Sequence, residues 1–264
     1  MKKLILFIFL LSISLKGNSQ TTYAVIVGIA DYQNNQAGFK DLTWTINDTK
    51  KISNFLMSKE GGSVPSSNIY VLTEEKAKKA NIIFYAKKLF DKAKEEDKVI
   101  FFFSGHGMPG AFLPYDFNPT NTDNFLSYDE VKSIFKSSKS KTKILYADAC
   151  YAGALKDNKK AVSEEKSNNE KGSDKSDVVI MLSCSENETS LESGETKQGL
   201  FSYFLIHGLK GYADLNKDNQ ITIDELHKYV YGKTVKAAKK RNNKQHPMTF
   251  GDFDKNLVVS KVYK

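Results

Sequence analysis

The sequence is poor in cysteine and in arginine, and each scarcity excludes a class of protein. Cys150 and Cys184 are the only two cysteines in 264 residues, too few for a disulfide framework. Arg241 is the only arginine, although lysines bring the formal net charge to +8. Specific recognition of phosphates and bases favours the guanidinium group, so the composition argues against nucleic acid as a partner.

Long apolar stretches are also absent, apart from one at the N-terminus. Lys2 and Lys3 precede the apolar segment Leu4–Leu15, and small or polar residues follow at 17–19. This order is typical of a secretory signal peptide. We therefore expect residues 1–20 to be removed and the mature protein to be secreted or periplasmic, with no membrane as a partner. The alternative is a short N-terminal anchor that is not cleaved.

The remaining residues, 21–264, can bury a sizeable core and alternate apolar strands with amphipathic helices. Strands are expected at 23–30, 68–72, 98–103, 143–147, 178–182 and 256–259, and helices at 47–57, 80–93, 128–135, 200–209 and from Thr222 onwards. This alternation predicts one α/β domain with a parallel sheet covered on both faces. In such sheets, sites form beyond the carboxyl ends of the strands.

One segment interrupts this alternation. Residues 155–177 contain no aromatic side chain and consist mostly of lysine, acidic residues, serine and asparagine. A segment with so little apolar surface cannot offset the entropy lost on ordering, which predicts a flexible loop within the domain.

Two of the expected strands end at reactive side chains flanked by glycine. The run 99–103 leads into Ser-Gly-His-Gly, which contains His106, and the run 144–147 leads into Asp-Ala-Cys-Tyr-Ala-Gly, which contains Cys150. Neighbouring parallel strands end at the same edge, so an imidazole and a thiol are expected to meet there, as in a cysteine protease. Each residue alone has a structural alternative, a strand-end histidine and a small core cysteine. Their matched placement favours catalysis.

The chemistry assigns a role to each of these residues. A thiol is a strong nucleophile as a thiolate, so Cys150 needs a neighbouring base; His106 can supply it and later protonate the leaving amine. Gly107 follows His106 and lacks a side chain, so its backbone N–H can approach a substrate closely. Together with the N–H of Cys150, it is expected to form an oxyanion hole.

The two motifs, with His106 and Cys150 44 residues apart, resemble those of the caspase-like cysteine peptidases. The resemblance is closer to metacaspases and their bacterial relatives than to animal caspases. It extends over roughly residues 22–235 through four further segments: 24–28, 46–48, 182–190 and 199–203. It implies a three-layer α/β/α sandwich with a mostly parallel sheet of about six strands, His106 as general acid and base, and Cys150 as nucleophile. Ala152 departs from the serine that is common in metacaspases.

Acidic residues near the candidate site indicate a preference for basic substrates. Asp148 lies two residues before Cys150, so in an extended strand the two side chains point to the same side, at the mouth of the substrate pocket. A carboxylate there suits a Lys or Arg side chain just before the cleaved bond. The metacaspase resemblance implies Asp48 as a second acidic pocket residue, with Asp31 as its rival. The structural alternatives are a helix-terminal carboxylate for Asp48 and a buried structural acid for Asp148.

Residues 214–225 match a twelve-residue calcium-binding loop of the EF-hand type. The expected oxygen ligands are Asp214, Asn216, Asp218, Gln220 through its carbonyl, Thr222 directly or through water, and Glu225. Asn219 stands where glycine is usual, and asparagine tolerates the left-handed conformation of that turn. The motif predicts calcium as a structural or regulatory cofactor, with no organic cofactor. The alternative is a hydrated connection between helices.

These features predict an exported cysteine endopeptidase that uses a Cys–His dyad and cleaves protein or peptide substrates after Lys or Arg. The loop 155–177 carries six lysines, so the enzyme is also expected to process itself there, unless the loop stays uncut. The alternative function is a catalytically silent caspase-like module that signals or binds partners. The presence of both His106 and Cys150 favours the enzyme.

Overall fold

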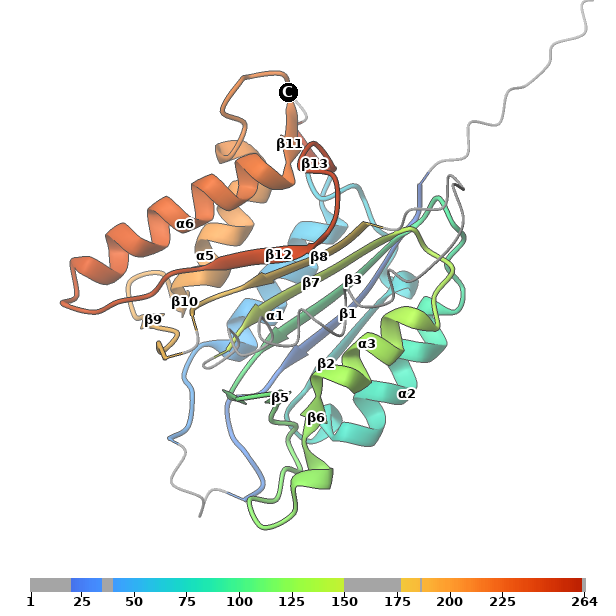
Figure 1. Cartoon of the computed structure of the whole chain (residues 1–264), viewed down its shortest axis with the longest axis vertical. Helices are drawn as coiled ribbons and strands as arrows, with labels where there is room; N and C mark the ends of the chain where they lie inside the picture. The colour runs from blue at the N-terminus through green and yellow to red at the C-terminus, as the bar shows by residue number, and fades with distance from the viewer. Residues whose placement is uncertain (1–19, 35–39, 150–176, 186, 263–264) are drawn as a thin grey trace, which may run out of the picture.

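The computed structural model describes residues 20–34, 40–149, 177–185 and 187–262, and a six-stranded sheet forms its centre (Figure 1). The strands of this sheet are β1 (Thr22–Gly28), β2 (Ile69–Thr73), β3 (Lys98–Ser104), β7 (Thr142–Asp148), β8 (Asp177–Leu182) and β12 (Met248–Asp252). Their spatial order is β12-β8-β7-β3-β1-β2. All neighbours pair in parallel except β12, which runs antiparallel to β8 at one edge.

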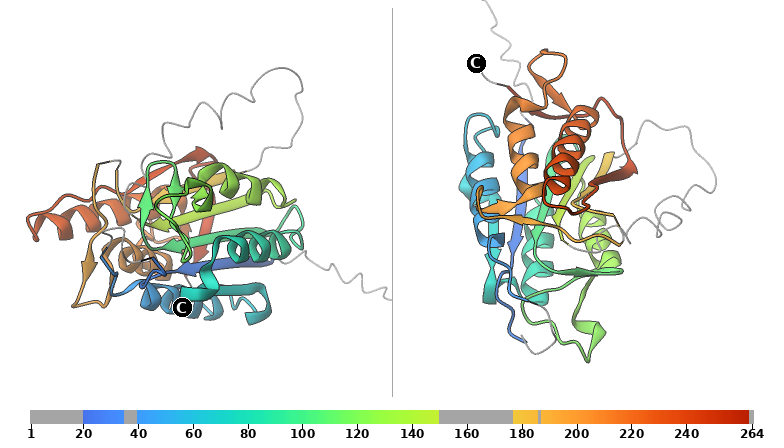
Figure 2. Two further views of the ribbon diagram at one scale, coloured as in Figure 1. Left: turned by 90° about the horizontal axis from the view of Figure 1, so that it is seen from below. Right: turned by 90° about the vertical axis from the view of Figure 1, so that its left-hand side faces the viewer.

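Helices cover both faces of this sheet (Figures 1 and 2). One face carries α1 (Thr45–Met57), α5 (Leu200–His207) and α6 (Ile223–Lys239), and the other carries α2 (Lys79–Phe90) and α3 (Tyr128–Lys136). Each helical layer forms its own apolar core against the sheet. The predicted three-layer α/β/α sandwich with a mostly parallel sheet is therefore confirmed.

Strand β3 shows why the central strands are apolar throughout. Val99, Phe101 and Phe103 belong to the core beneath α2 and α3, whereas Ile100 and Phe102 belong to the core beneath α1, α5 and α6. Because both faces of the strand are covered, all seven of its residues are buried.

The strand register aligns the chain segments from which a site can form. Gly28 at the end of β1 pairs with Ser104 at the end of β3, and Ser104 pairs with Asp148 at the end of β7. These three strand ends therefore lie side by side, and we call this end of the sheet the carboxyl edge.

Short elements extend both ends of the sheet. They are β4 (Gly107–Met108), β5 (Ala111–Phe112), β6 (Leu126–Ser127), β9 (Glu192–Ser193), β10 (Gln198–Gly199), β11 (Gln220–Thr222), β13 (Val258–Lys261), the 3-10 helices Ser66–Asn68, Glu74–Ala77 and Thr122–Asn124, and the π-helix η6 (Gly208–Tyr212). The sheet of β4, β5 and β6 lies at the carboxyl edge, and the pair β11–β13 lies at the opposite, amino end (Figure 1).

The C-terminal region differs from the sequence prediction. The strand expected at 256–259 forms at β13 and pairs with β11, outside the central sheet. The edge of the central sheet is instead β12, which was not predicted. Gly251 in β12 has a φ of 132°, and a Cβ there would lie 1.9 Å from the Val178 carbonyl oxygen. A short strand that contains a glycine shows too little alternation of apolar and polar residues to be recognised from the sequence.

Some sequence predictions lie outside the described residues. These are the signal peptide up to residue 19, Cys150, Ala152 and the loop up to residue 176. Across the described ranges, no helix has the length and apolar character needed to span a bilayer.

Candidate active site

Strand β3 delivers His106 to the carboxyl edge. The N–H of Gly105 donates to the Asp148 carbonyl oxygen at 3.1 Å, which joins the ends of β3 and β7. A Cβ on Gly105 would lie 2.8 Å from the Tyr32 hydroxyl, so this approach requires glycine. That hydroxyl accepts from the N–H of His106 at 2.7 Å, and the two rings lie 5.2 Å apart. Tyr32, on the loop after β1, therefore fixes both the backbone and the ring of His106.

The hydrogen bond of the His106 ring identifies the nitrogen that can act as a base. Nε2 lies 2.7 Å from the backbone carbonyl oxygen of Lys40. A carbonyl only accepts hydrogen bonds, so in the neutral ring Nε2 carries the proton and Nδ1 carries the lone pair. Burial lowers the pKa of His106, against the opposite effects of the Lys40 carbonyl and nearby carboxylates. The neutral form, which can accept a proton at Nδ1, is thus favoured.

Glu192 in β9 supports the segment that provides the Lys40 carbonyl. Its carboxylate accepts from the backbone N–H of Thr43 at 3.0 Å and of Trp44 at 2.6 Å. Sequence reasoning missed Glu192 because an isolated glutamate in a loop shows no pattern. In the structure it holds the backbone of Thr43 and Trp44, which follows Lys40 closely along the chain.

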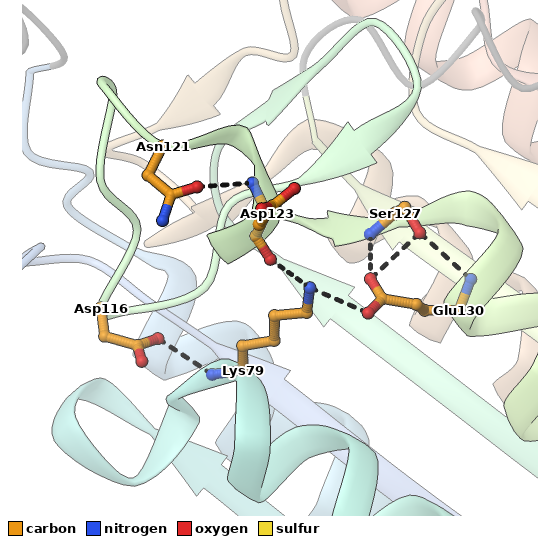
Figure 3. Close-up of polar contacts among 6 residues, drawn as sticks. All are labelled: Lys79, Asp116, Asn121, Asp123, Ser127 and Glu130. Atoms are coloured by element: carbon orange, nitrogen blue, oxygen red, sulfur yellow. Dashed lines mark hydrogen bonds and ion pairs between the residues drawn. The ribbon is translucent and has the colours of Figure 1, made fainter.

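A polar network centred on Lys79, at the start of α2, holds the loop between β5 and β6 (Figure 3). The Lys79 Nζ donates to the Asp123 carbonyl oxygen at 2.6 Å and pairs with Glu130 at 2.8 Å. The Lys79 N–H donates to Asp116 at 2.9 Å. Glu130 also closes the capping box of α3 with Ser127. These contacts join the loop between β5 and β6 to the first turns of α2 and α3.

The backbone N–H of Gly107 is not used by the small sheet to which Gly107 belongs. In β4, Gly107 pairs with Phe112 of β5, and the hydrogen bond from the Leu113 N–H to the His106 carbonyl lies just outside this pair. In an antiparallel ladder this arrangement marks a pair that does not exchange hydrogen bonds, so the Gly107 N–H points away from β5. The geometry is compatible with the predicted oxyanion role.

The backbone that precedes Cys150 is held firmly, although Cys150 itself lies outside the described residues. Ala149 is the last described residue before it. The Ala149 N–H donates to the Ser183 hydroxyl at 3.1 Å, and its carbonyl accepts from Ser183 Oγ at 3.0 Å and Cys184 Sγ at 3.4 Å. The end of β8 therefore fixes the chain immediately before the candidate nucleophile.

Asp48 and Asp148 meet at Gly199, and we call them the acid pair. A Cβ on Gly199 would lie 2.2 Å from Asp148 Oδ2 and 3.3 Å from Asp48 Oδ2. The rival Asp31 is exposed on the loop after β1 and has no contact with Asp148 among the described interactions. Both members of the acid pair are covered, with 1% of Asp48 and 6% of Asp148 exposed. This differs from the position expected for Asp148 at an open pocket mouth.

Hydroxyl and backbone groups donate hydrogen bonds to the acid pair. Asp48 accepts from the Ser104 hydroxyl at 3.0 Å and from a backbone N–H of β10 at 3.2 Å. Asp148 accepts from the N–H of Ser202 at 3.0 Å, from its hydroxyl at 2.7 Å, and from the Ser190 hydroxyl. The roles of these serines are not apparent from the sequence, since they come from three distant segments.

The acid pair consists of two buried carboxyl groups for which the described residues provide no counter-ion. Burial, reinforced by the charge of Asp148, raises the pKa of Asp48 well above its ordinary value. Burial also raises the pKa of Asp148, although hydrogen bonds from Ser190 and Ser202 oppose this. Within the described part of the chain, no basic side chain forms an ion pair with either carboxylate. A cationic group placed here would therefore be stabilised.

The candidate calcium loop, residues 214–225, has a backbone suited to a tight oxygen-lined turn. Lys217 and Asn219 adopt positive φ angles of 63° and 65°. The Asp214 carboxylate accepts from the N–H of Asp218 at 3.1 Å and of Asn219 at 3.0 Å. The asparagine at the position usual for glycine thus adopts the expected left-handed conformation.

The carboxylate that would complete this site is engaged elsewhere. Glu225 accepts from the N–H and hydroxyl of Thr222 at 3.0 and 2.8 Å, and from the Leu215 N–H at 3.3 Å. In the described ranges, no three His, Cys, Asp or Glu side chains gather closely enough to hold a metal. The loop's oxygen donors suit calcium, but a bound ion would require Glu225 to leave its capping contacts.

Together these features define a class of protein. A mostly parallel α/β sheet presents a histidine at the end of one strand, and a cysteine follows the end of the neighbouring strand by two residues, as in caspase-like cysteine peptidases. The family model of the caspase domain matches residues 21–258, and the chain belongs to this family of cysteine-type peptidases. The predicted family resemblance is confirmed.

Individual relatives agree with this assignment. A probable protease from a Desulfuromonadales bacterium is 28% identical over 150 residues, which are 48% of this chain; the chain spans only 18% of that relative's length. A crystal structure of a protein from Geobacter sulfurreducens matches with a TM-score of 0.60 and 15% identity, over 92% of this chain and 100% of that one. Caspase-1 from Spodoptera frugiperda matches with a TM-score of 0.64 and 16% identity, over 92% and 91% of the two chains. At these identities the two structures show the fold alone.

Proposed function

We propose that this protein is an exported cysteine endopeptidase that cleaves peptide bonds after Lys or Arg. The observation that carries the proposal is the acid pair, two buried carboxyl groups with no basic partner among the described residues, beside the strand ends that lead to His106 and Cys150. Family membership supports the peptidase chemistry, and the acid pair supports the preference for a basic side chain. Protein or peptide substrates with Lys or Arg at the cleavage site are the proposed partners.

In the proposed reaction, Cys150 attacks the carbonyl carbon of the scissile peptide bond. Nδ1 of His106 accepts the thiol proton, and the new C–S bond forms as the carbonyl oxygen becomes an oxyanion. His106 then gives the proton to the leaving amine as the C–N bond breaks, which leaves a thioester. Water, deprotonated by His106, cleaves the thioester and restores the thiol. The Lys40 carbonyl accepts from Nε2 in both the neutral and the protonated ring and so holds the ring in one orientation.

Two further groups of the site act on the substrate. The N–H of Gly107, together with that of Cys150, is proposed to donate to the oxyanion, where negative charge develops only during the reaction. The acid pair attracts the Lys or Arg side chain that precedes the cleaved bond through its charge. Because the two carboxyls are buried, this attraction is screened less by water than the attraction of an exposed carboxylate.

The raised pKa of Asp48 predicts a pH dependence of substrate selection. Below that pKa the carboxyl is protonated and loses its attraction for a cation, so KM for a Lys peptide should rise as the pH falls through it. A peptide with citrulline, which is neutral, in place of the basic residue should lack this change. The ratio of kcat/KM for the two peptides, measured from about pH 5 to 8, isolates the effect because titration of His106 alters both equally. A ratio independent of pH would contradict the assignment.

We also propose that the enzyme cleaves its own chain within residues 155–177, which carry six lysines. Intact-mass spectrometry should show two fragments for the wild type and one chain for Cys150→Ala. Identical uncut chains in both would contradict self-processing.

Spectra of the exported protein also give its N-terminus, which signal removal should place near residue 21.

Calcium is proposed as a structural ligand of the loop 214–225, held by Asp214, Asn216, Asp218, the Gln220 carbonyl, Thr222 and Glu225. The ion would supply no catalytic chemistry and would brace the connection between η6 and α6. Titration calorimetry should show weak binding of one calcium ion, lost in Glu225→Gln and retained in the exposed control Glu195→Gln. Equal heats for the wild type and Glu225→Gln would rule out this site.

A further inference from the structure

A cavity of about 890 Å³ lies at the amino end of the sheet, far from the carboxyl edge. It is bounded by the end of α1, the starts of β1 and β3, and the β11–β13 pair, which meet at the end of the sheet opposite β5 (Figure 1). This volume falls within the range of small-molecule sites, about 300 to 1,000 Å³. The catalytic proposal makes no use of it.

One part of the cavity wall is apolar and the rest is polar. Ile52 and Phe55 of α1, Ile100 and Tyr146 of the central strands, and Leu209 of η6 line it. These residues all belong to the apolar core on the α1 side of the sheet. The cavity is therefore an opening in that core, suited to a hydrocarbon chain.

A buried ammonium group lies in this apolar wall. Lys98 begins β3, and strand alternation places it on the same face as Ile100, where an apolar residue would be expected. Lys98 is only 8% exposed, and its Nζ donates to the Val259 carbonyl oxygen at 3.2 Å. In the described part of the molecule no carboxylate pairs with it; Glu60, the acidic residue of the lining, is exposed and unconnected to it.

The charged side chain that acts most on Lys98 is another cation. Lys261 of β13 also lines the cavity. Burial, with the positive charge of Lys261, lowers the pKa of Lys98 to about 8, so the group is still largely protonated at pH 7. A buried cation without a counter-ion is costly, and an anion in the cavity would offset that cost.

We propose that this cavity binds a single-chain amphipathic anion, with its headgroup at Lys98 and Lys261 and its hydrocarbon chain against Phe55 and Leu209. A medium-chain carboxylate is the simplest ligand of this class. A neutral chain leaves the ammonium groups uncompensated, and a small anion without a chain leaves the apolar walls empty. Both parts of the ligand therefore contribute to its affinity.

Calorimetry of the purified Cys150→Ala protein with decanoate, 1-decanol and acetate tests this site without reference to activity. Decanoate should bind saturably, and acetate should not. Lys98→Met keeps the length of the side chain and removes its charge, so it should weaken decanoate binding at least about tenfold and leave 1-decanol unaffected. Lys143→Met is the matched control, because Lys143 lies near the start of the neighbouring strand on the opposite face of the sheet. It should bind decanoate like the wild type.

A second variant keeps the test decisive if Lys98→Met is unstable. Val258→Trp places a large ring in the cavity from a partly exposed position and should block decanoate while the protein still unfolds cooperatively. Saturable binding that neither variant weakens, or the absence of saturable binding to a folded wild type, would overturn the proposal.

Discussion

Replacing Cys150 by alanine should lower kcat for Lys and Arg peptides by at least about 10⁴-fold, because the bond-forming atom is lost. His106→Ala should have an effect of similar size, since the thiol then has no base and the leaving amine has no acid. Residues that act as one unit do not contribute additively, so the double variant should be little worse than either single one. Fluorogenic peptides with Lys, Arg, Asp or Asn at the cleavage position measure all of these rates.

Cys184→Ala is the control for this experiment. Cys184 is buried and donates through Sγ to the carbonyls of Ala149 and Glu188, so it is placed to support the backbone and not to attack substrate. This variant should retain cleavage. A Cys150→Ala protein that still turns over peptides would contradict the proposed nucleophile. A folded wild type that cleaves none of the panel would favour the alternative of a silent caspase-like module.

Replacing Asp148 by asparagine should lower kcat/KM for Lys and Arg peptides by about 10²- to 10³-fold. The side chains have the same shape, so the amide oxygen can keep both hydrogen bonds from Ser202, whereas the amide NH2 donates to the Ser190 hydroxyl in place of accepting from it, and the charge disappears. The loss should appear mainly in KM, because the Lys or Arg side chain is bound in the ground state as well as in the transition state. A citrulline peptide, in contrast, should be cleaved at nearly the wild-type rate.

Asp97→Asn provides the matched control for Asp148→Asn. Asp97 is also a buried carboxylate that accepts from two backbone N–H groups, those of Thr21 and Lys94, but it lies at the amino end of the sheet. Its replacement should reduce stability and leave the preference for Lys and Arg over citrulline unchanged. If Asp148→Asn keeps the preference and Asp31→Asn loses it, the pocket assignment is wrong.

The elements that positioned the candidate catalytic residues were predictable from local sequence. The continuous apolar run before His106 required a strand buried on both faces, and β3 is such a strand. The Ser-Gly-His-Gly and Asp-Ala-Cys motifs begin at the last residues of β3 and β7, which are neighbours in the sheet. The two motifs therefore marked, in the sequence alone, the strand ends that form the carboxyl edge. Helix boundaries shifted only slightly, as with α1, which begins at Thr45 instead of residue 47.

The supporting contacts of the site could not be predicted because they join residues that are distant in the sequence. Ser104 contacts Asp48 across 56 positions, and Ser202 contacts Asp148 across 54. The Lys40 carbonyl belongs to the backbone, whose position no residue type reveals. The burial of the acid pair likewise depends on β10 and α5 closing over it, which is a property of the tertiary structure.

The most direct test of the account is covalent labelling with a peptidyl acyloxymethyl ketone that carries Lys at the recognition position. Mass spectrometry of the digested protein should find one adduct per chain, on Cys150. Labelling should fall sharply in His106→Ala and in Asp148→Asn, and an analogue with Asp in place of Lys should not react. An adduct on Cys184, or labelling that is indifferent to both variants, would contradict the assignment of nucleophile, base and pocket.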